Sequence, residues 1–239
     1  MSQTSKRSVK PNRQQLVVVI GDNSGSMRGL KAEAATEGIR QMIIECMSRS
    51  GGEESLYRVL FISFGDRAKI DKQCRRTPVL EIDTDQISLR GDGGGTNLRE
   101  ALELAHSEIS DYLDEIAGHP QKAKHPLPLV ILFSDGRNGD NFGRPEAAAE
   151  RLKELQYDSQ PILILTAGVA VKDSDNPDEH TLKAIASHYK GTPLYVPIEK
   201  ASALSVFLAA AGSSAASTAG EVYEVIKGFL EAPSTRRLT

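Results

Sequence analysis

Four short and almost uniformly apolar runs divide the chain and predict the strands of a buried sheet. They span residues 15–21, 57–64, 127–134 and 161–167. Strands that are covered on both faces need continuous apolar side chains, whereas half-exposed strands alternate apolar and polar ones. We therefore expect a central sheet with helices on both of its faces.

Helical patterns separate these runs. In residues 97–117 apolar side chains recur at steps of three and four, and residues 28–48 repeat the pattern. Further helices are expected to begin near Pro145 and Pro177, because the fixed φ of proline suits a first helical turn. Strands that alternate with helices are typical of an α/β fold with a doubly wound, mostly parallel, Rossmann-like sheet.

The segment 66–84 differs from the other predicted strands. It alternates with period two in places and includes Pro78, so it predicts one or two strands at the edge of the sheet. We expect an antiparallel edge strand here.

The two ends of the chain differ from its centre. Residues 1–13 carry basic side chains and no acid, which predicts a flexible basic tail, and residues 14–211 are expected to form one domain. Small residues dominate 212–220 and indicate a linker, while 221–230 fit a short amphipathic helix. The sequence leaves open whether this helix, within the C-terminal segment 212–239, docks on the domain or serves a partner.

Composition narrows the classes of protein that the chain can represent. Its 239 residues are 39% apolar and 26% charged with a net charge of −3, which is typical of a globular protein and shows no basic excess for nucleic acid. No run approaches the roughly 20 apolar residues of a membrane helix, and the N-terminal segment lacks the apolar stretch of a signal peptide. Cys46 and Cys74 have no paired spacing, which favours free thiols in a reducing compartment. We expect a cytoplasmic protein with neither a nucleic-acid nor a membrane partner.

Short oxygen donors follow the first apolar run. Asp22, Ser24 and Ser26 stand at alternate positions directly after it. Hard divalent cations prefer such ligands, and Mg²⁺ in particular takes one or two carboxylates together with waters and a substrate oxygen. The pattern predicts a metal site with room for a further ligand.

Two other loops carry oxygen donors that could join this site. Asp135 follows the run 127–134, and Thr96 ends the glycine-rich segment 91–96. Ligands of a doubly wound sheet bind outside the carboxyl ends of its strands, where the strand order reverses. If the runs 15–21 and 127–134 are neighbours there, three loops supply an all-oxygen set: Asp22, Ser24, Ser26, Thr96 and Asp135.

Each feature also has a purely structural explanation. Asp22 and Ser24 are favoured helix caps, and Ser134-Asp135-Gly136 taken alone is a common turn. The glycine-rich loop is not a phosphate loop, because no Gly-Lys-Ser/Thr follows it. The five histidines lack paired ligand spacing, which argues against a zinc site. Only the three loops together favour a metal centre.

Three motifs resemble a known family. Asp-Asn-Ser-Gly-Ser-Met at 22–27, Gly-Gly-Thr-Asn-Leu at 94–98 and Ser-Asp-Gly at 134–136 resemble the metal-ion-dependent adhesion site of von Willebrand factor type A domains. The likeness covers residues 14–211 and implies one divalent ion at the upper edge of the sheet. It implies that Ser24 and Ser26 ligate directly, and that Asp22, Thr96 and Asp135 bind directly or through water.

The same resemblance implies an open coordination position that accepts an acidic side chain, Asp or Glu, of a partner protein. Residues expected near that partner are Asn23, Gly95, Arg137 and Asn138, although the loop after Asp135 is equally well explained as solvated. Gly21 departs from the family pattern, in which a bulkier residue usually precedes the first Asp, and suggests a looser loop.

Within the family, the chain looks most like the stand-alone proteins of bacterial tellurium-resistance and stress clusters, some of which have a Ser-rich stretch like that at 213–218. That likeness suggests a kinase, phosphatase or defence-complex component as partner. Our leading hypothesis is a non-enzymatic interaction module that depends on Mg²⁺, with Mn²⁺ or Ca²⁺ as alternative ions. A Mg²⁺-dependent phosphoester hydrolase and a structural subunit with an incidental metal are the competing hypotheses.

Overall fold

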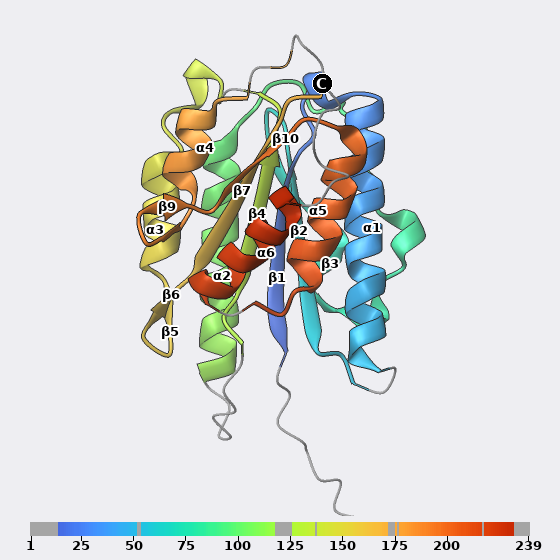
Figure 1. Ribbon diagram of the computed structural model, residues 1–239, viewed down its shortest axis with the longest axis vertical. Coiled ribbons are helices and arrows are strands. Elements are labelled where there is room, and N and C mark those ends of the chain that lie inside the picture. The colour runs from blue at the N-terminus through green and yellow to red at the C-terminus, as the bar shows by residue number, and fades with distance from the viewer. Residues whose placement is uncertain are drawn as a thin grey trace, which may run out of the picture.

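A six-stranded sheet forms the centre of the protein, as the computed structural model shows (Figure 1). The structure describes residues 14–51, 54–117, 126–136, 138–171, 175, 177–216 and 218–231. The strand order is β10-β7-β4-β1-β2-β3. The strands are β1 (Gln15–Asp22), β2 (Tyr57–Phe64), β3 (Ala68–Pro78), β4 (Leu129–Ser134), β7 (Leu163–Val169) and β10 (Tyr195–Ile198).

The central strands are the predicted apolar runs. Every residue of β1, β4 and β7 is buried, as strands with both faces covered require. Five strands run parallel to one another, and β3 alone runs antiparallel to them, paired with β2. The expected mostly parallel sheet with one antiparallel edge strand is confirmed. Two 3₁₀ turns, at Val79–Glu81 and Thr84–Gln86, occupy the place of a second edge strand.

Helices cover both faces of the sheet (Figure 1). On one face α1 (Leu30–Ser50) packs along α5 (Ala201–Ser213), with α6 (Ala219–Glu231) beside α5. On the other face α2 (Leu98–Ala117) packs on α3 (Glu146–Glu154), which contacts α4 (Glu179–Ile185). Two small hairpins complete the described fold: β5 (Gln156–Tyr157) with β6 (Gln160–Pro161), and β8 (His188–Tyr189) with β9 (Thr192–Pro193).

The C-terminal helix docks on the domain, which the sequence left open. Val222, Ile226 and Phe229 of α6 are buried, and the Phe229 ring lies edge-on to Phe207 of α5 with ring centroids 5.5 Å apart. The predicted linker is too long at both ends, because α5 continues through Ser213 and α6 begins at Ala219. The predicted basic tail, residues 1–13, lies outside the described residues.

Both cysteines lie buried, as expected, Cys46 in α1 and Cys74 in β3, and neither forms a disulfide. Burial raises the pKa of each thiol to about 12, so both stay protonated at neutral pH. In the part of the chain that the structure describes, no helix combines the length and the apolarity that a membrane crossing needs.

Candidate metal centre

The first and fourth strands are neighbours, which brings two of the predicted loops together. β1 pairs with β4 up to Gly21 and Phe133, so Asp22 and Ser134 lie side by side at the carboxyl ends of the two strands. The chain continues from β1 to β2 on one side and from β4 to β7 on the other. This is the point where strand order reverses, where ligands of such sheets bind.

Gly21 permits this close pairing. A Cβ atom at Gly21 would lie only 2.8 Å from Cζ of Phe133, whose ring fills the space beside the strand. Gly21 is paired with Ser63 on one side and Phe133 on the other. An aromatic ring from β4 therefore fills the space that a side chain at Gly21 would occupy.

Asp22 is fully buried at the end of β1. Its Oδ1 accepts a hydrogen bond from the backbone N–H of Ser24 at 2.8 Å, and its Oδ2 accepts from the Ser134 hydroxyl at 2.5 Å. Burial raises the pKa of the Asp22 carboxyl to about 6, and these hydrogen bonds offset part of that effect. A cation bound nearby would stabilise the charged form of this buried carboxylate.

Hydroxyl groups connect Asp22 to the second carboxylate. The Oγ atoms of Ser24 and Ser26 are 2.9 Å apart, and the Ser26 hydroxyl donates to Oδ1 of Asp135 at 2.7 Å. Thr96 reaches the same place, since a Cβ atom at Gly136 would lie 3.4 Å from Oγ1 of Thr96 and 3.9 Å from Oγ of Ser26. The structure thus brings all five predicted donor residues together.

The glycine-rich loop is held by backbone hydrogen bonds that leave no room for side chains. The N–H of Gly93 donates to Asn23 O at 2.8 Å, and Gly93 O accepts from Asp66 N at 2.7 Å. A Cβ atom at Gly65 would lie 2.1 Å from Gly93 O, and Gly94 has a φ of +79°. These contacts fix the chain just before Thr96 and so position its hydroxyl.

The residues predicted to face a partner hold the loops in place. The Asn23 side chain donates to Asp92 Oδ1 at 2.9 Å and accepts from the backbone N–H of Gly91 at 2.8 Å. Asn138 accepts from Leu98 N at 3.0 Å, at the start of α2, and donates to Gly143 O at 2.6 Å.

The backbone N–H of Gly95 donates to Asp66 Oδ1 at 2.7 Å. Arg137 lies outside the described residues. The described residues of the predicted partner surface therefore hold in place the loops that carry the donor residues (the metal loops), namely those after β1 and β4 and the glycine-rich loop before α2.

Lys31 belongs to the site, and the sequence analysis did not find it. The side chain is 1% exposed, and its ammonium contacts Oδ2 of Asp135 and, at 2.7 Å, Oδ1 of Asp175. Burial lowers the pKa of Lys31, but the two carboxylates outweigh burial and hold it above its ordinary value. One signal was available: Lys31 shares the inward face of its helix with Ala35, Ile39 and Met42.

The donor set fits a hard divalent cation. Two carboxylates and three hydroxyls supply oxygen atoms alone, the ligand type of Mg²⁺, Mn²⁺ and Ca²⁺. Within the described ranges, no three or more His, Cys, Asp or Glu side chains group as metal ligands. A site of this kind would depend on hydroxyl oxygens as well as on the two carboxylates.

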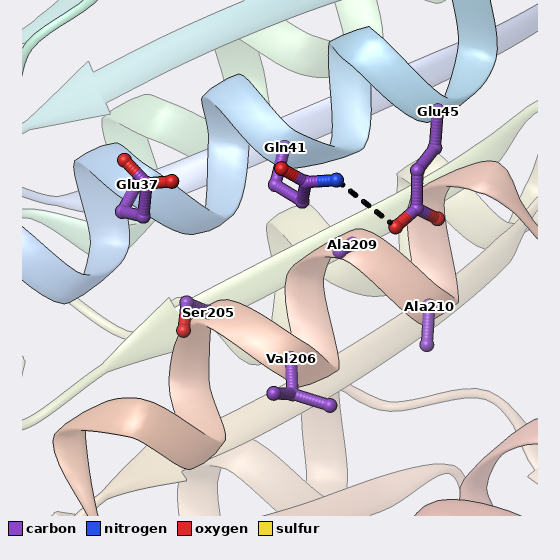
Figure 2. Close-up of a pocket in the computed structure, with 7 residues that line it drawn as sticks. All are labelled: Glu37, Gln41, Glu45, Ser205, Val206, Ala209 and Ala210. Atoms are coloured by element: carbon purple, nitrogen blue, oxygen red, sulfur yellow. Dashed lines mark hydrogen bonds between the residues drawn. The ribbon is translucent and has the colours of Figure 1, made fainter. Parts of the chain in front are cut away.

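A groove lies away from these loops, between two helices of one face of the sheet (Figure 2). This groove of about 280 Å³ runs between α1 and α5 and includes Glu37, Gln41, Glu45 and Val206. Gln41 Nε2 donates to Glu45 Oε1 at 3.4 Å. Glu37 and Glu45 are eight residues apart, about 12 Å along a helix at 1.5 Å per residue, too far to share one ion. The groove is therefore not a second metal centre.

Fold and site together define a class: a doubly wound α/β domain with a cluster of carboxylate and hydroxyl oxygens at its topological switch point. The chain belongs to the von Willebrand factor type A domain family, whose model matches residues 16–204. A comparison with curated protein sequences found no significant match.

Solved structures with the same fold include a mussel byssus protein and a bacterial pilus adhesin. Proximal thread matrix protein 1 from the mussel byssus has a TM-score of 0.60 and 17% identity over 84% of this chain and 47% of its own. A form of that protein with a zinc-occupied metal-ion-dependent adhesion site has a TM-score of 0.58 and 16% identity over 83% and 47%. The pilus adhesin SpaC from Lactobacillus rhamnosus GG, in an open conformation, reaches 0.57 and 17% over 92% and 31%. This chain thus spans less than half of the length of these proteins, and the likeness establishes the fold.

Proposed function

We propose that this protein is a metal-dependent protein-interaction module that binds an acidic side chain of a partner. The observation that carries the proposal is the continuous set of contacts from Asp22 through Ser24 and Ser26 to Asp135, beside Thr96. The zinc-occupied adhesion site of the mussel thread protein supports a divalent ion at such a site.

In this proposal Ser24 and Ser26 hold the ion directly, while Asp22, Thr96 and Asp135 hold it directly or through water. Mg²⁺ is the proposed ion, with Mn²⁺ and Ca²⁺ as alternatives. When bound, the ion supplies a positive charge that its protein ligands neutralise only in part. A partner Asp or Glu would complete both its coordination and its charge.

The N-termini of two helices should also favour an acidic side chain of the partner. α1 begins at Leu30 and α2 begins at Leu98, each directly after a metal loop. The N-terminus of a helix carries a partial positive charge, which stabilises an anion. Asn97 caps α2 by accepting from Glu100 N at 3.2 Å, so the start of this helix is well defined. Binding of an acidic side chain needs no bond to form or break, and we propose no enzymatic activity.

The test compares the wild-type protein with Ser24→Ala, using Ser107→Ala on the exposed face of α2 as the matched control. Titration calorimetry with MgCl₂ should show binding to the wild type and to Ser107→Ala, and at least tenfold weaker binding to Ser24→Ala. Proteins that co-purify in Mg²⁺ should be released by EDTA and absent with Ser24→Ala. Retention in EDTA would instead support a structural subunit.

The hydrolase hypothesis has its own test. If the site activates water, the wild type should hydrolyse p-nitrophenyl phosphate in Mg²⁺, and Asp22→Ala should not. A flat time course for both proteins removes this hypothesis.

We further propose a bacterial stress-resistance or defence setting in the cytoplasm, with a kinase, phosphatase or defence-complex component as partner. The likeness of the chain, with its Ser-rich stretch at 213–218, to stand-alone stress-cluster proteins supports the setting, and the two buried free thiols fit a reducing compartment. Quantitative mass spectrometry of the proteins that co-purify only in Mg²⁺ tests the proposed setting and the proposed class of partner.

A further inference from the structure

Lys31 is a buried charge at the metal centre that the ligand set does not use. It is the second residue of α1, and its side chain turns inward toward the loops instead of lying on the helix surface. A lone buried ammonium is strongly disfavoured, so its position must be stabilised by counter-charges. Asp135 and Asp175 supply them, from loops that are 104 and 144 residues away in the chain.

The two carboxylate oxygens of Asp135 have different partners, and one of these partners is the Lys31 ammonium. Oδ1 accepts from the Ser26 hydroxyl, on the side of the other metal donors, while Oδ2 contacts Lys31. Asp175 also lies almost entirely inside, with a side chain that is 7% exposed. Two carboxylates, from Asp135 and Asp175, therefore contact one fixed positive charge.

We propose that Lys31 is a resident counter-cation of the adhesion site, which weakens binding of the divalent ion and keeps the loops folded when no ion is bound. This inference rests on the proposed metal site. The ammonium repels an incoming dication at short range and already neutralises part of the charge of Asp135. In exchange, Asp135 and Asp175 keep a partner without the ion, so the domain does not need metal to fold. Binding then becomes conditional on ion concentration, or on a partner that adds a carboxylate.

The decisive variant is Lys31→Met, which keeps most of the length of the side chain and removes its charge. The full chain, freed of metal with EDTA and dialysed, is titrated with MgCl₂ and MnCl₂ in a calorimeter. The dissociation constant should fall by about tenfold or more, since removing a like charge at close range is worth at least the factor of ten that about 1.4 kcal/mol represents. The melting temperature in EDTA should fall, because Asp135 and Asp175 both lose their contact with the Lys31 ammonium.

Three further variants complete the test. Lys31→Arg keeps the charge and should bind Mg²⁺ as weakly as the wild type. Lys227→Met makes the same exchange on the exposed face of α6 and should change neither the dissociation constant for Mg²⁺ nor the melting temperature in EDTA. Lys31→Met combined with Asp175→Asn also removes the charge of one of the two carboxylates that Lys31 contacts. It should regain stability in EDTA and bind Mg²⁺ with an affinity between those of the wild type and the single variant. This double variant keeps the test decisive if Lys31→Met alone does not fold.

The outcomes separate this inference from the proposed function. If the wild type binds Mg²⁺ and neither Lys31 charge-removing variant binds more tightly, the inference fails and the function stands. If only the variants bind Mg²⁺, the inference holds and the wild-type function does not depend on Mg²⁺ as proposed. If no protein binds either ion, both fail.

Discussion

The hydroxyl of Ser26 donates a hydrogen bond to Oδ1 of Asp135 at 2.7 Å, across 109 residues of chain. This one contact joins the loop after β1 to the loop after β4 and sets two of the proposed metal donors at a common point. It depends on the pairing of β1 with β4, which places the two strand ends side by side. The site is therefore a property of the sheet order, and perturbing either the oxygens or the strand pairing should be measurable.

Metal binding should stabilise the domain. Any ligand of the folded state raises the free energy of unfolding, by about 2.7 kcal/mol at a hundredfold excess over the dissociation constant. In a domain of this size that corresponds to roughly 5–10 °C in melting temperature. Differential scanning fluorimetry with increasing MgCl₂ should show this rise for the wild type and for Ser107→Ala, and little for Ser26→Ala. A wild-type melting temperature that ignores Mg²⁺, Mn²⁺ and Ca²⁺ alike would contradict the site.

Asp22 should make the metal-free protein less stable as pH rises. Burial raises the pKa of its carboxyl to about 6 from an ordinary value of 3.8, so between these values the folded protein binds more protons than the unfolded chain. The contribution of Asp22 therefore falls as pH rises from about 4 to about 6 and is constant above, a loss of up to roughly 3 kcal/mol.

Asp22→Asn should remove this slope, which urea unfolding in EDTA at pH 4.5, 5.5 and 7 would measure. An unchanged slope in the variant would assign the pH dependence to other groups. In the wild type, protons should also compete with the metal, so Mg²⁺ affinity should weaken below about pH 6.

Gly21→Ala should destabilise the sheet beside the metal site. The added methyl group would lie 2.8 Å from the Phe133 ring, and overpacking of this kind typically costs about 1–3 kcal/mol. Gly228→Ala is the matched control, because a Cβ atom there would contact nothing within 4 Å; alanine in that helix should add up to about 1 kcal/mol.

Combining Gly21→Ala with Phe133→Leu provides the double-mutant cycle, in which the smaller side chain should recover part of the loss. Strictly additive free energies of unfolding would show that the two positions do not interact.

Loss of the Asp135 carboxylate should destabilise the protein even without metal. Asp135→Ala leaves Lys31 with Asp175 alone and removes the acceptor of Ser26. Removing one member of a buried ion pair typically costs about 3–5 kcal/mol, and the remaining partner should hold the loss near the lower end. Urea unfolding in EDTA measures it against Asp114→Ala, an exposed acid of α2 that should change stability by less than about 0.5 kcal/mol. Equal stability of the two variants would show that the pair contributes little.

Local pattern was sufficient for the central strands and most of the helices. Buried parallel strands require continuous apolar runs, so β1, β2, β4 and β7 could be located directly from the sequence. Helix α5 was not predicted from the sequence. Its residues are small or apolar on most faces, so apolar and polar positions do not alternate with a clear helical period. Strand β10 was not predicted either, because its four residues are too few to show a clear apolar run.

The sequence alone determined which residue types stand at the strand ends, and those types carry the prediction of an all-oxygen metal site. Only the tertiary structure decided what each side chain does there. The amides of Asn23 and Asn138 are used to hold loops, and the Lys31 ammonium joins Asp135 to Asp175. Composition and periodicity describe neighbours along the chain, whereas a buried ion pair or a shared hydrogen bond depends on which distant segments the sheet order brings into contact.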